Sequence, residues 1–192
     1  MDEGLAKIRH ARSKKDFPFL ELEDNEYVEY AFSRAKVCLV MIFGGTLAGL
    51  ILLLLGFLMA LTQPYVIGEI GKNFAYIIIT CLLLADLLIG VVALVVYRGN
   101  RLFVTNKHVI QLLMKSPVAT SVNVIDLPSI EDVSFHQDGL MQRALRYGTF
   151  RLSTIGDETT YTFSYSDIAP EDLRAVSKII TEAKARAKRE KN

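Results

Sequence analysis

A single aspartate, Asp86, stands near the middle of the stretch from Phe74 to Tyr97, which carries no other charge. An ionisable side chain at the centre of a membrane helix costs about 2.5–3.5 kcal/mol on insertion scales, so it marks a functional position by default. In an antiparallel helix pair its depth matches Thr46 and Gly49 of the preceding apolar stretch. We expect Asp86 to face that stretch and, in its protonated form, to donate a hydrogen bond to Thr46 or to a backbone carbonyl.

Small residues accompany this aspartate on both apolar stretches. Gly45 and Gly49 form a GxxxG motif, which lets helix backbones approach closely, either within the pair or between chains. Gly90 follows Asp86 at i+4, on the same helix face. Three roles are open for this group: hydrogen bonding that holds the helix pair together, a contact to another subunit, or a proton relay in transport. Neither stretch contains a Lys or Arg to partner Asp86, which disfavours transport.

The other titratable residues form no catalytic or metal-binding pattern. His10, His108 and His136 lie far apart, and none has the HExxH spacing or a nearby Cys. The carboxylate pairs at 157–158 and 171–172 fall in a predicted hairpin turn and at a predicted helix start, and those positions explain them. The chain has no P-loop, nucleophile elbow or dinucleotide fingerprint. We therefore expect no enzyme, no metal and no other cofactor.

Two long apolar runs dominate the 192 residues, of which 51% are hydrophobic and 22% charged. Residues 37–61 contain no charge, and both this run and residues 74–97 exceed the roughly 20 residues that cross a hydrocarbon core. Pro64, Gly68 and Gly71 between them interrupt a continuous helix. The sequence therefore predicts a transmembrane helical hairpin over residues 37–97.

The charges that flank this hairpin predict its orientation. The loop between the two runs contains one basic residue, Lys72. The Lys and Arg residues on the other side are Arg34, Lys36, Arg98, Arg101 and Lys107. By the positive-inside rule both termini face the cytoplasm. The net charge of +1 argues against a nucleic-acid partner, and Cys38 and Cys81 cannot form a disulfide framework.

The segment before the hairpin, residues 1–36, divides into two parts. Its first fifteen residues are polar, and we expect them to fray or to lie on the surface. Four apolar residues follow, and they either pack on the downstream domain or rest at the bilayer interface: Phe17, Phe19, Leu20 and Leu22. From about Asn25 the pattern indicates a helix that leads into the first span.

Residues 98–192 change from a period of two to a helical period. Six strands are predicted, at residues 101–105, 108–114, 121–127, 130–135, 149–154 and 160–165. A helix over about 170–189 follows, with Pro170 in its first turn. Its apolar stripe consists of Leu173, Val176, Ile179, Ile180 and Ala183. This order favours an antiparallel sheet or small barrel closed by one amphipathic helix.

Four phrases within this order resemble the bacterial pleckstrin-homology (PH) domain family. They are Asn100–Gln111, Leu127–Val133, Gln137–Arg143 and Tyr147–Leu152, and the upstream Glu26-Tyr27-Val28 is similar as well. The resemblance covers most of residues 25–183. It implies two membrane helices before a seven-stranded barrel in a bacterial inner membrane. The seventh strand is then within 115–120 or 137–147, or absent.

The expected fold is thus a two-helix transmembrane hairpin plus a mostly antiparallel β, PH-like small barrel closed by a C-terminal amphipathic helix. Residues 1–36 form a cytoplasmic N-terminal segment, 37–97 the hairpin, with spans at 37–61 and 74–97, and 98–192 the cytoplasmic PH-like domain. The resemblance brings no established activity. We expect a non-enzymatic scaffold that binds a protein segment or a second copy of itself, with the lipid bilayer as its other partner.

A basic cluster near the C-terminus supports an alternative function. It comprises Lys184, Arg186, Lys188, Arg189 and Lys191. These cations either complement the helix dipole or, with Arg98, Arg101 and Lys107, contact anionic lipid headgroups. The alternatives are therefore a sensor of the anionic lipid surface or a small subunit of a membrane transport or export complex.

Overall fold

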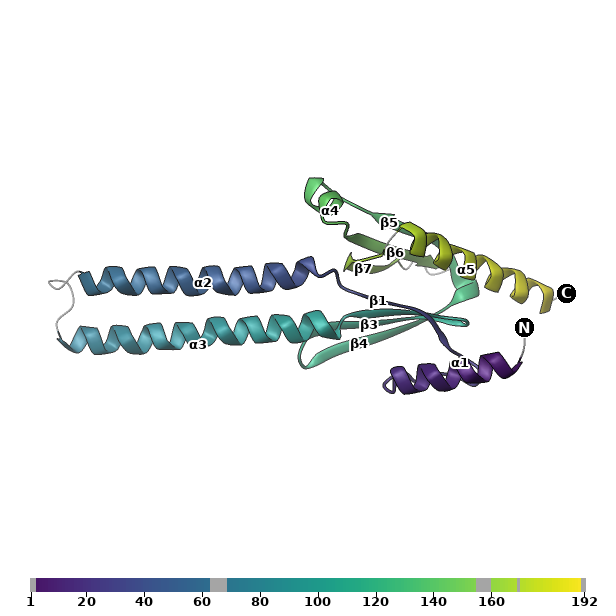
Figure 1. Cartoon of the computed structure of the whole chain (residues 1–192), viewed down its shortest axis with the longest axis horizontal. Coiled ribbons are helices and arrows are strands. Elements are labelled where there is room, and N and C mark those ends of the chain that lie inside the picture. The colour runs from purple at the N-terminus through teal and green to yellow at the C-terminus, as the bar shows by residue number, and fades with distance from the viewer. Residues whose placement is uncertain (1–2, 63–68, 155–159, 169, 191–192) are drawn as a thin grey trace. The chain divides into compact units, whose positions relative to one another are not determined.

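The computed structural model describes residues 3–62, 69–154, 160–168 and 170–190. The chain divides into two compact units. Residues 1–35 and 98–192 make up one, here called the β unit, and residues 36–97 make up the other, the helical unit. The β unit is therefore interrupted in sequence by the helical unit (Figure 1).

The helical unit consists of α2 (Val37–Thr62) and α3 (Glu69–Gly99), whose last residues enter the β unit. The segments Val37–Met59 and Phe74–Gly99 are long and apolar enough to cross a membrane, and their side chains are not buried within the protein. Gly71, expected in the loop, lies inside α3, because a glycine within a helix costs only about 1 kcal/mol. Pro64 and Gly68 lie outside the described residues.

Seven strands of the β unit, all antiparallel, form two sheets in the part of the chain that the structure describes. The first sheet has the order β1 (Val28–Ser33), β2 (Arg101–Thr105), β3 (His108–Ser116), β4 (Ala119–Asp126). The second has the order β5 (Ile130–His136), β6 (Gly148–Thr154), β7 (Thr160–Ser166). The helical elements are α1 (Glu3–Asp16), the 3₁₀ turn η1 (Leu127–Ser129), α4 (Leu140–Ala144) and α5 (Pro170–Glu190).

The strand missing from the sequence prediction is β1, which precedes the apolar helices. The helix predicted from about Asn25 is wrong, because Val28–Ser33 pairs with β2, with Ser33 opposite Arg101. Residues 137–147 hold the short helix α4 instead of a strand, and residues 115–120 hold the β3–β4 turn. The predicted domain 98–192 thus lacks its first strand. The six predicted strands are confirmed, although the turn expected at 156–158 lies outside the described residues.

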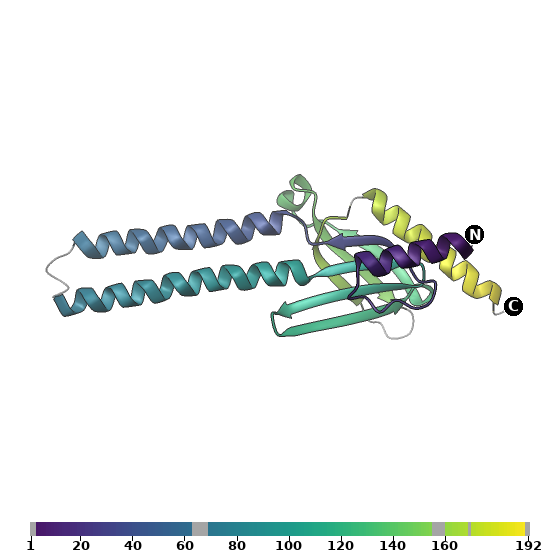
Figure 2. The same ribbon diagram turned by 60° about the horizontal axis from the view of Figure 1, so that its bottom comes forward.

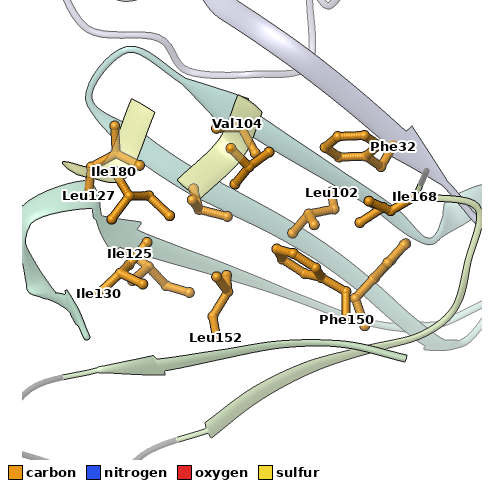
Figure 3. Close-up of a cluster of buried hydrophobic side chains, with 13 residues drawn as sticks. Phe32, Leu102, Val104, Ile125, Leu127, Ile130, Phe150, Leu152, Ile168 and Ile180 are labelled. Carbon is orange, nitrogen blue, oxygen red and sulfur yellow. The ribbon is translucent and has the colours of Figure 1, made fainter. Parts of the chain in front are cut away.

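The two sheets face each other, and among the described residues the strand pairing does not run continuously around the small barrel that the sequence predicts. An isolated bridge between Arg34 and Ser166 links the end of β1 to β7, and η1 links β4 to β5. Between the sheets lies the main core (Figure 3), composed of Phe32, Leu102, Val104, Val109, Ile125, Leu127, Ile130, Phe150, Leu152, Phe163, Ile168, Val176 and Ile180. Val176 and Ile180 come from α5, so the predicted apolar stripe packs onto the sheets.

The opposite face of the first sheet is covered by the N-terminal segment. Leu20 is buried against Phe103 and Ile110, and the rings of Phe17 and Phe103 meet edge to face at 5.0 Å. These apolar residues therefore pack on the domain, which decides between the two placements left open by the sequence. The polar segment before them forms α1, where Ser13 Oγ accepts a hydrogen bond from the Val28 N–H at 3.0 Å.

Candidate functional site

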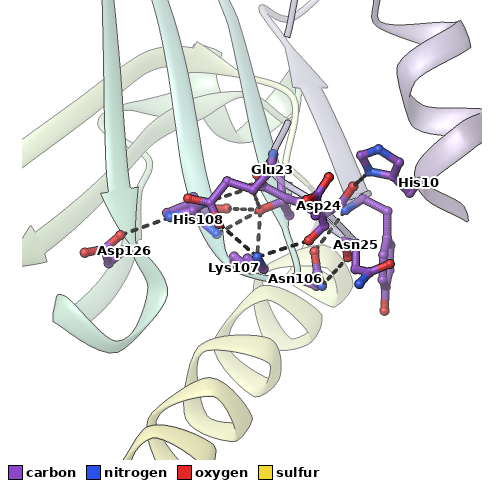
Figure 4. A network of polar contacts seen from close by, with 11 residues as sticks. His10, Glu23, Asp24, Asn25, Asn106, Lys107, His108 and Asp126 are labelled. Carbon is purple, nitrogen blue, oxygen red and sulfur yellow. Dashed lines mark hydrogen bonds and ion pairs between the residues drawn. The ribbon is translucent and has the colours of Figure 1, made fainter. Parts of the chain in front are cut away.

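A buried carboxylate, Glu26, links the segment before α2 to the β2–β3 turn. Figure 4 shows the surrounding polar network, in which Asn106, Lys107 and His108 come from that turn and the start of β3. Glu26 is 1% exposed. Its Oε1 accepts a hydrogen bond from Thr105 Oγ1 at 2.6 Å and lies 2.9 Å from His108 Nδ1. Its Oε2 accepts the Glu23 N–H at 2.9 Å. Neighbouring bonds strengthen the same junction, since the Tyr27 N–H donates to Asn106 Oδ1 at 2.9 Å.

These contacts set the ionisation of Glu26. Burial raises the pKa of this carboxyl, but the hydrogen bonds from Thr105, the Glu23 N–H and His108, together with the charge of His108, hold it below its usual value. The second ring nitrogen of His108 lies 3.1 Å from Asp126 Oδ1. Both nitrogens of this imidazole are therefore engaged, which leaves neither free to act as a base. Within the described ranges no group of three or more His, Cys, Asp or Glu residues is placed to hold a metal ion.

The strand register assigns the turns that the structure describes in the β unit to one of two ends. At the first, here called the exit end, β1 finishes and β2 begins. Asn100 Nδ2 donates to the Met114 carbonyl at 3.0 Å, so the β3–β4 turn starts at this end. The β5–β6 connection with α4 also lies here. His136 pairs with Thr149, Gly148 pairs with Ser166, and Ser166 in turn bridges to Arg34 at the end of β1.

The opposite end holds the β2–β3 turn, η1 and the later part of α5. The Leu127 N–H donates to the Lys107 carbonyl at 3.0 Å, and Lys184 Nζ donates to the Glu131 carbonyl at 3.2 Å. Figure 1 shows the C-terminal end of α5 on the far side of the β unit from α4.

The predicted lipid-contacting cations are consequently divided between the two ends. Arg98 and Arg101 lie at the exit end, and the Arg101 guanidinium covers the Phe19 ring at 5.6 Å. Lys107 lies at the opposite end, where its Nζ is 2.8 Å from Glu23 Oε2. Lys184 lies there too, and α5 continues beyond it through Arg186, Lys188 and Arg189. Lys191 lies outside the described residues.

An exposed edge strand, β4, borders the first sheet. It pairs with β3 on one side, and within the described part of the chain no strand pairs with its other side. Val122 and Val124 on β4 are 57% and 58% exposed. The strand contains no Lys, Arg or Pro. Edge strands usually carry such residues to prevent pairing with other chains, and β4 lacks this protection.

In the helical unit, α2 and α3 meet where the sequence places Asp86. A methyl group added at Gly49 would lie 2.5 Å from Asp86 Oδ1, and one added at Gly90 would lie 2.5 Å from Thr46 Cγ2. Gly45 faces open space, with no described atom within 4 Å of such a group. Of the two GxxxG glycines, only Gly49 thus contacts α3.

The expected hydrogen bond from Asp86 to Thr46 is absent from the described contacts. Thr46 Oγ1 lies 3.2 Å from the Ile42 carbonyl and 3.0 Å from that of Phe43, so its one proton is directed back to its own helix. Asp86 Oδ2 is buried and has no hydrogen-bond partner among the described residues.

Comparison with known proteins identifies the family. The model of the bacterial PH domain family matches residues 17–184, which is most of the chain. This protein belongs to the bacterial PH domain family. The match begins at Phe17, before the apolar helices, in agreement with a PH domain that includes β1.

Solved structures and curated proteins add little to this PH domain assignment. The crystal structure of a DUF1696 family protein with a pleckstrin-homology domain, from Shewanella loihica, is similar over 44% of this chain and 70% of its own. The sequence identity is 14% and the TM-score 0.33, values too low to support an argument. No curated protein matches the chain.

The buried Glu26 was not singled out as a site residue by the sequence reasoning. The available signal was the phrase Glu26-Tyr27-Val28, which resembles the family. That resemblance does not say which residues Glu26 contacts. Its partners Thr105 and His108 follow α3, so only the folded PH domain brings the three side chains together.

Proposed function

We propose that this protein is a membrane-anchored bacterial PH domain without enzymatic activity, which binds an extended protein segment along the free edge of β4. The hairpin of α2 and α3 anchors it in the bacterial inner membrane, with both termini in the cytoplasm. The observation that carries this proposal is the unprotected β4 edge with its exposed Val122 and Val124. An added strand would gain main-chain hydrogen bonds there, and the two valines would select its side chains.

The anchor and its orientation rest on composition and flanking charge. Both helices present apolar side chains that the protein does not bury, and hydrocarbon would cover them. Lys36 and Arg98 lie next to the ends at which α2 begins and α3 finishes, which supports a cytoplasmic side there. A non-enzymatic role is supported by the His108 imidazole, whose two nitrogens are bound to Glu26 and Asp126.

The β4 edge is tested by photo-crosslinking of the full-length protein in its native membrane. A photoreactive amino acid at Val124 is expected to give a discrete adduct with a protein. The same photoreactive amino acid in place of Lys178, an exposed position on α5, is the matched control and should give no protein adduct. Val122→Lys should lower the Val124 adduct by up to about fivefold, because a cross-strand pair contributes about 0.2–1 kcal/mol.

The alternative outcomes of this experiment are distinct. An adduct with the mass of two copies would identify a second copy of this chain as the source of the added strand. Adducts of equal yield at Val124 and Lys178, or no protein adduct at Val124, would contradict strand addition at β4.

A second candidate function, a small subunit of a membrane transport or export complex, is favoured by one observation. Asp86 Oδ2 is buried in the helical unit without a partner among the described residues. A polar atom inside hydrocarbon requires a partner. The Asp86 side chain as a whole is only half-buried, so a change of rotamer would present its carboxyl to a helix of another subunit.

Asp86→Leu is expected to reduce the mass of the detergent-solubilised complex to that of the isolated chain, because the polar contact is lost. Asp86→Asn keeps a hydrogen-bonding side chain of the same shape and should retain the larger mass. Mass measurement by light scattering would contradict this role if wild type and Asp86→Leu had the same mass. If their thermal stability were also the same, a role in holding the hairpin together would fail too.

A further inference from the structure

The exit end of the β unit carries exposed apolar side chains on two separate projections. Val118, at the tip of the β3–β4 turn, is 96% exposed. Leu140 and Met141, on α4, are 86% and 65% exposed. Figures 1 and 2 show both projections at the same end of the β unit, away from the C-terminus. Exposed apolar side chains at two points of the same end favour a contact surface there, because water is a poor environment for them.

The local backbone gives each projection a defined shape. β3 and β4 extend past the last β2–β3 pair, Arg101 opposite Leu112, so the pairs up to Ser116 and Ala119 form a projecting hairpin. At the other projection Gly139 has φ = +86°, which L side chains rarely adopt, and α4 begins directly after it. The two apolar tips are therefore held by ordered turns.

Basic residues outnumber acidic ones at this end, six to four. The Lys and Arg residues at this end are Arg34, Arg98, Arg101, Lys115, Arg143 and Arg146. The Asp and Glu residues at this end are Asp138, Asp167, Glu171 and Asp172. The exposed cations Lys115, Arg143 and Arg146 form no ion pair within the described part of the chain. Apolar tips accompanied by exposed cations that have no ion-pair partner are complementary to an anionic lipid surface.

Covalent connection favours a lipid surface over a soluble protein partner. The chain leaves the β unit after Ala35 and returns at Arg98, and α2 begins at Val37. Both passages belong to the exit end. At about 3.5 Å per extended residue, the connections between this end and the apolar helices are at most about 10 Å long. A membrane that held these helices would place its headgroups within reach of the exit end.

We propose that the exit end is a lipid-contact surface that inserts Val118, Leu140 and Met141 into an anionic membrane and binds headgroups through Lys115, Arg143 and Arg146. This inference rests on the membrane anchoring of the proposed function and is independent of strand addition at β4. It differs from a lipid contact through the basic C-terminal helix, because Lys184 and the cations after it lie at the opposite end.

Depth-dependent quenching in vesicles tests this surface with the full-length protein. In a Cys38→Ser, Cys81→Ser background, an environment-sensitive fluorophore is attached after Val118→Cys, Met141→Cys or Lys188→Cys. Vesicles contain brominated lipids with or without phosphatidylglycerol as the anionic lipid. The labels at positions 118 and 141 are expected to be quenched, and more strongly with the anionic lipid. The label at 188, at the opposite end, is the control and should not be quenched.

Charge removal provides the second arm of the experiment. Arg143→Ser and Arg146→Ser leave the apolar tips intact. In anionic vesicles each substitution should lower the ratio of membrane-bound to unbound exit ends about fivefold, since one basic residue near such a surface contributes about 1 kcal/mol. In neutral vesicles each should have little effect. Exposed arginines tolerate this change without loss of the fold, so the quenching reports the contact itself.

Four outcomes would overturn the proposal. Quenching at position 188 equal to or above that at 118 and 141 would assign lipid contact to the C-terminal helix. A blue shift at 118 and 141 without quenching by brominated lipid would indicate a protein contact. Failure of the protein to enter vesicles at all would contradict the anchoring itself, and with it the proposed function, whereas entry without quenching would contradict only the lipid-contact surface.

Discussion

Glu26→Ala is expected to lower the free energy of unfolding of the β unit by about 3 kcal/mol. The substitution removes the carboxylate that accepts hydrogen bonds from Thr105 and the Glu23 N–H and that pairs with His108. Thr105 Oγ1 still lies 2.9 Å from the His108 carbonyl, but the Glu23 N–H and the His108 ring lose their acceptor at a buried junction, where loss of a charged partner costs most. The measurement is amide hydrogen exchange of β1 and β2 in the full-length protein.

The pH dependence of this stability follows from the lowered pKa of Glu26. A carboxyl whose pKa is lower in the folded protein than in the unfolded chain, where it is about 4.3, adds stability above that pH. The added stability is lost as the pH falls through the pKa of the folded state. We therefore expect the difference between wild type and Glu26→Ala to be largest near neutral pH and to shrink in acid below about pH 4.

Glu23→Ala is the matched control for this prediction. Its side chain is 60% exposed and pairs with Lys107 at 2.8 Å, and surface ion pairs contribute at most about 1 kcal/mol. The backbone N–H that Glu23 donates to Glu26 is kept in the variant. Equal losses of stability in the two variants, or a Glu26→Ala protein with unchanged exchange, would show that the buried carboxylate does not hold the junction.

Gly49→Leu is expected to separate α2 from α3 in the helical unit. A methyl group alone at this position would lie 2.5 Å from Asp86 Oδ1, and a leucine side chain adds further volume at a close helix contact. Overpacking of this kind costs about 1–3 kcal/mol. The readout is crosslinking between Phe57→Cys and Tyr76→Cys, at positions whose rings lie 5.4 Å apart, in a Cys38→Ser, Cys81→Ser background. With a short bifunctional thiol reagent, the yield should fall roughly tenfold.

Gly45→Leu separates this local contact from a general effect of bulk in α2. Gly45 belongs to the same GxxxG motif but faces open space in the described structure, so the crosslink yield should stay near that of the parent. A large loss with Gly45→Leu and none with Gly49→Leu would mean that the helices pack through another face. A lower crosslink yield in both variants would indicate that Gly45 packs against a second copy of the chain, and that α2 and α3 need this copy to stay together.

Much of this architecture follows from local patterns in the sequence. The sequence predicted the two apolar helices, the six strands after Arg98 and the helix from Pro170. Each of these elements has an apolar run or a regular hydrophobic period within one continuous segment. The approach of Asp86 to Gly49 was predicted as well, since equal depth in an antiparallel pair depends only on helix rise. The hydrogen bond between Asp86 and Thr46 was not found, because Thr46 bonds to its own helix.

The tertiary structure decided what no local pattern contains. β1 was predicted as a helix because its partner strand, β2, follows only after α2 and α3. Half of the side chains of β1 are exposed, so its own residues give little indication of a strand without the pairing to β2. Glu26 became a site residue only when folding brought Thr105 and His108 to it.

The same holds for surfaces. The sequence by itself determined that the chain has two apolar helices, a β-rich domain and clusters of basic residues. Only the strand register determined that Arg98 and Arg101 share one end with Val118 and Met141, whereas Lys107 and Lys184 share the other. The physical reason is that the ends of a sheet are assembled from turns distant in sequence, whose relative positions depend on hydrogen bonds between strands and not on neighbouring residues.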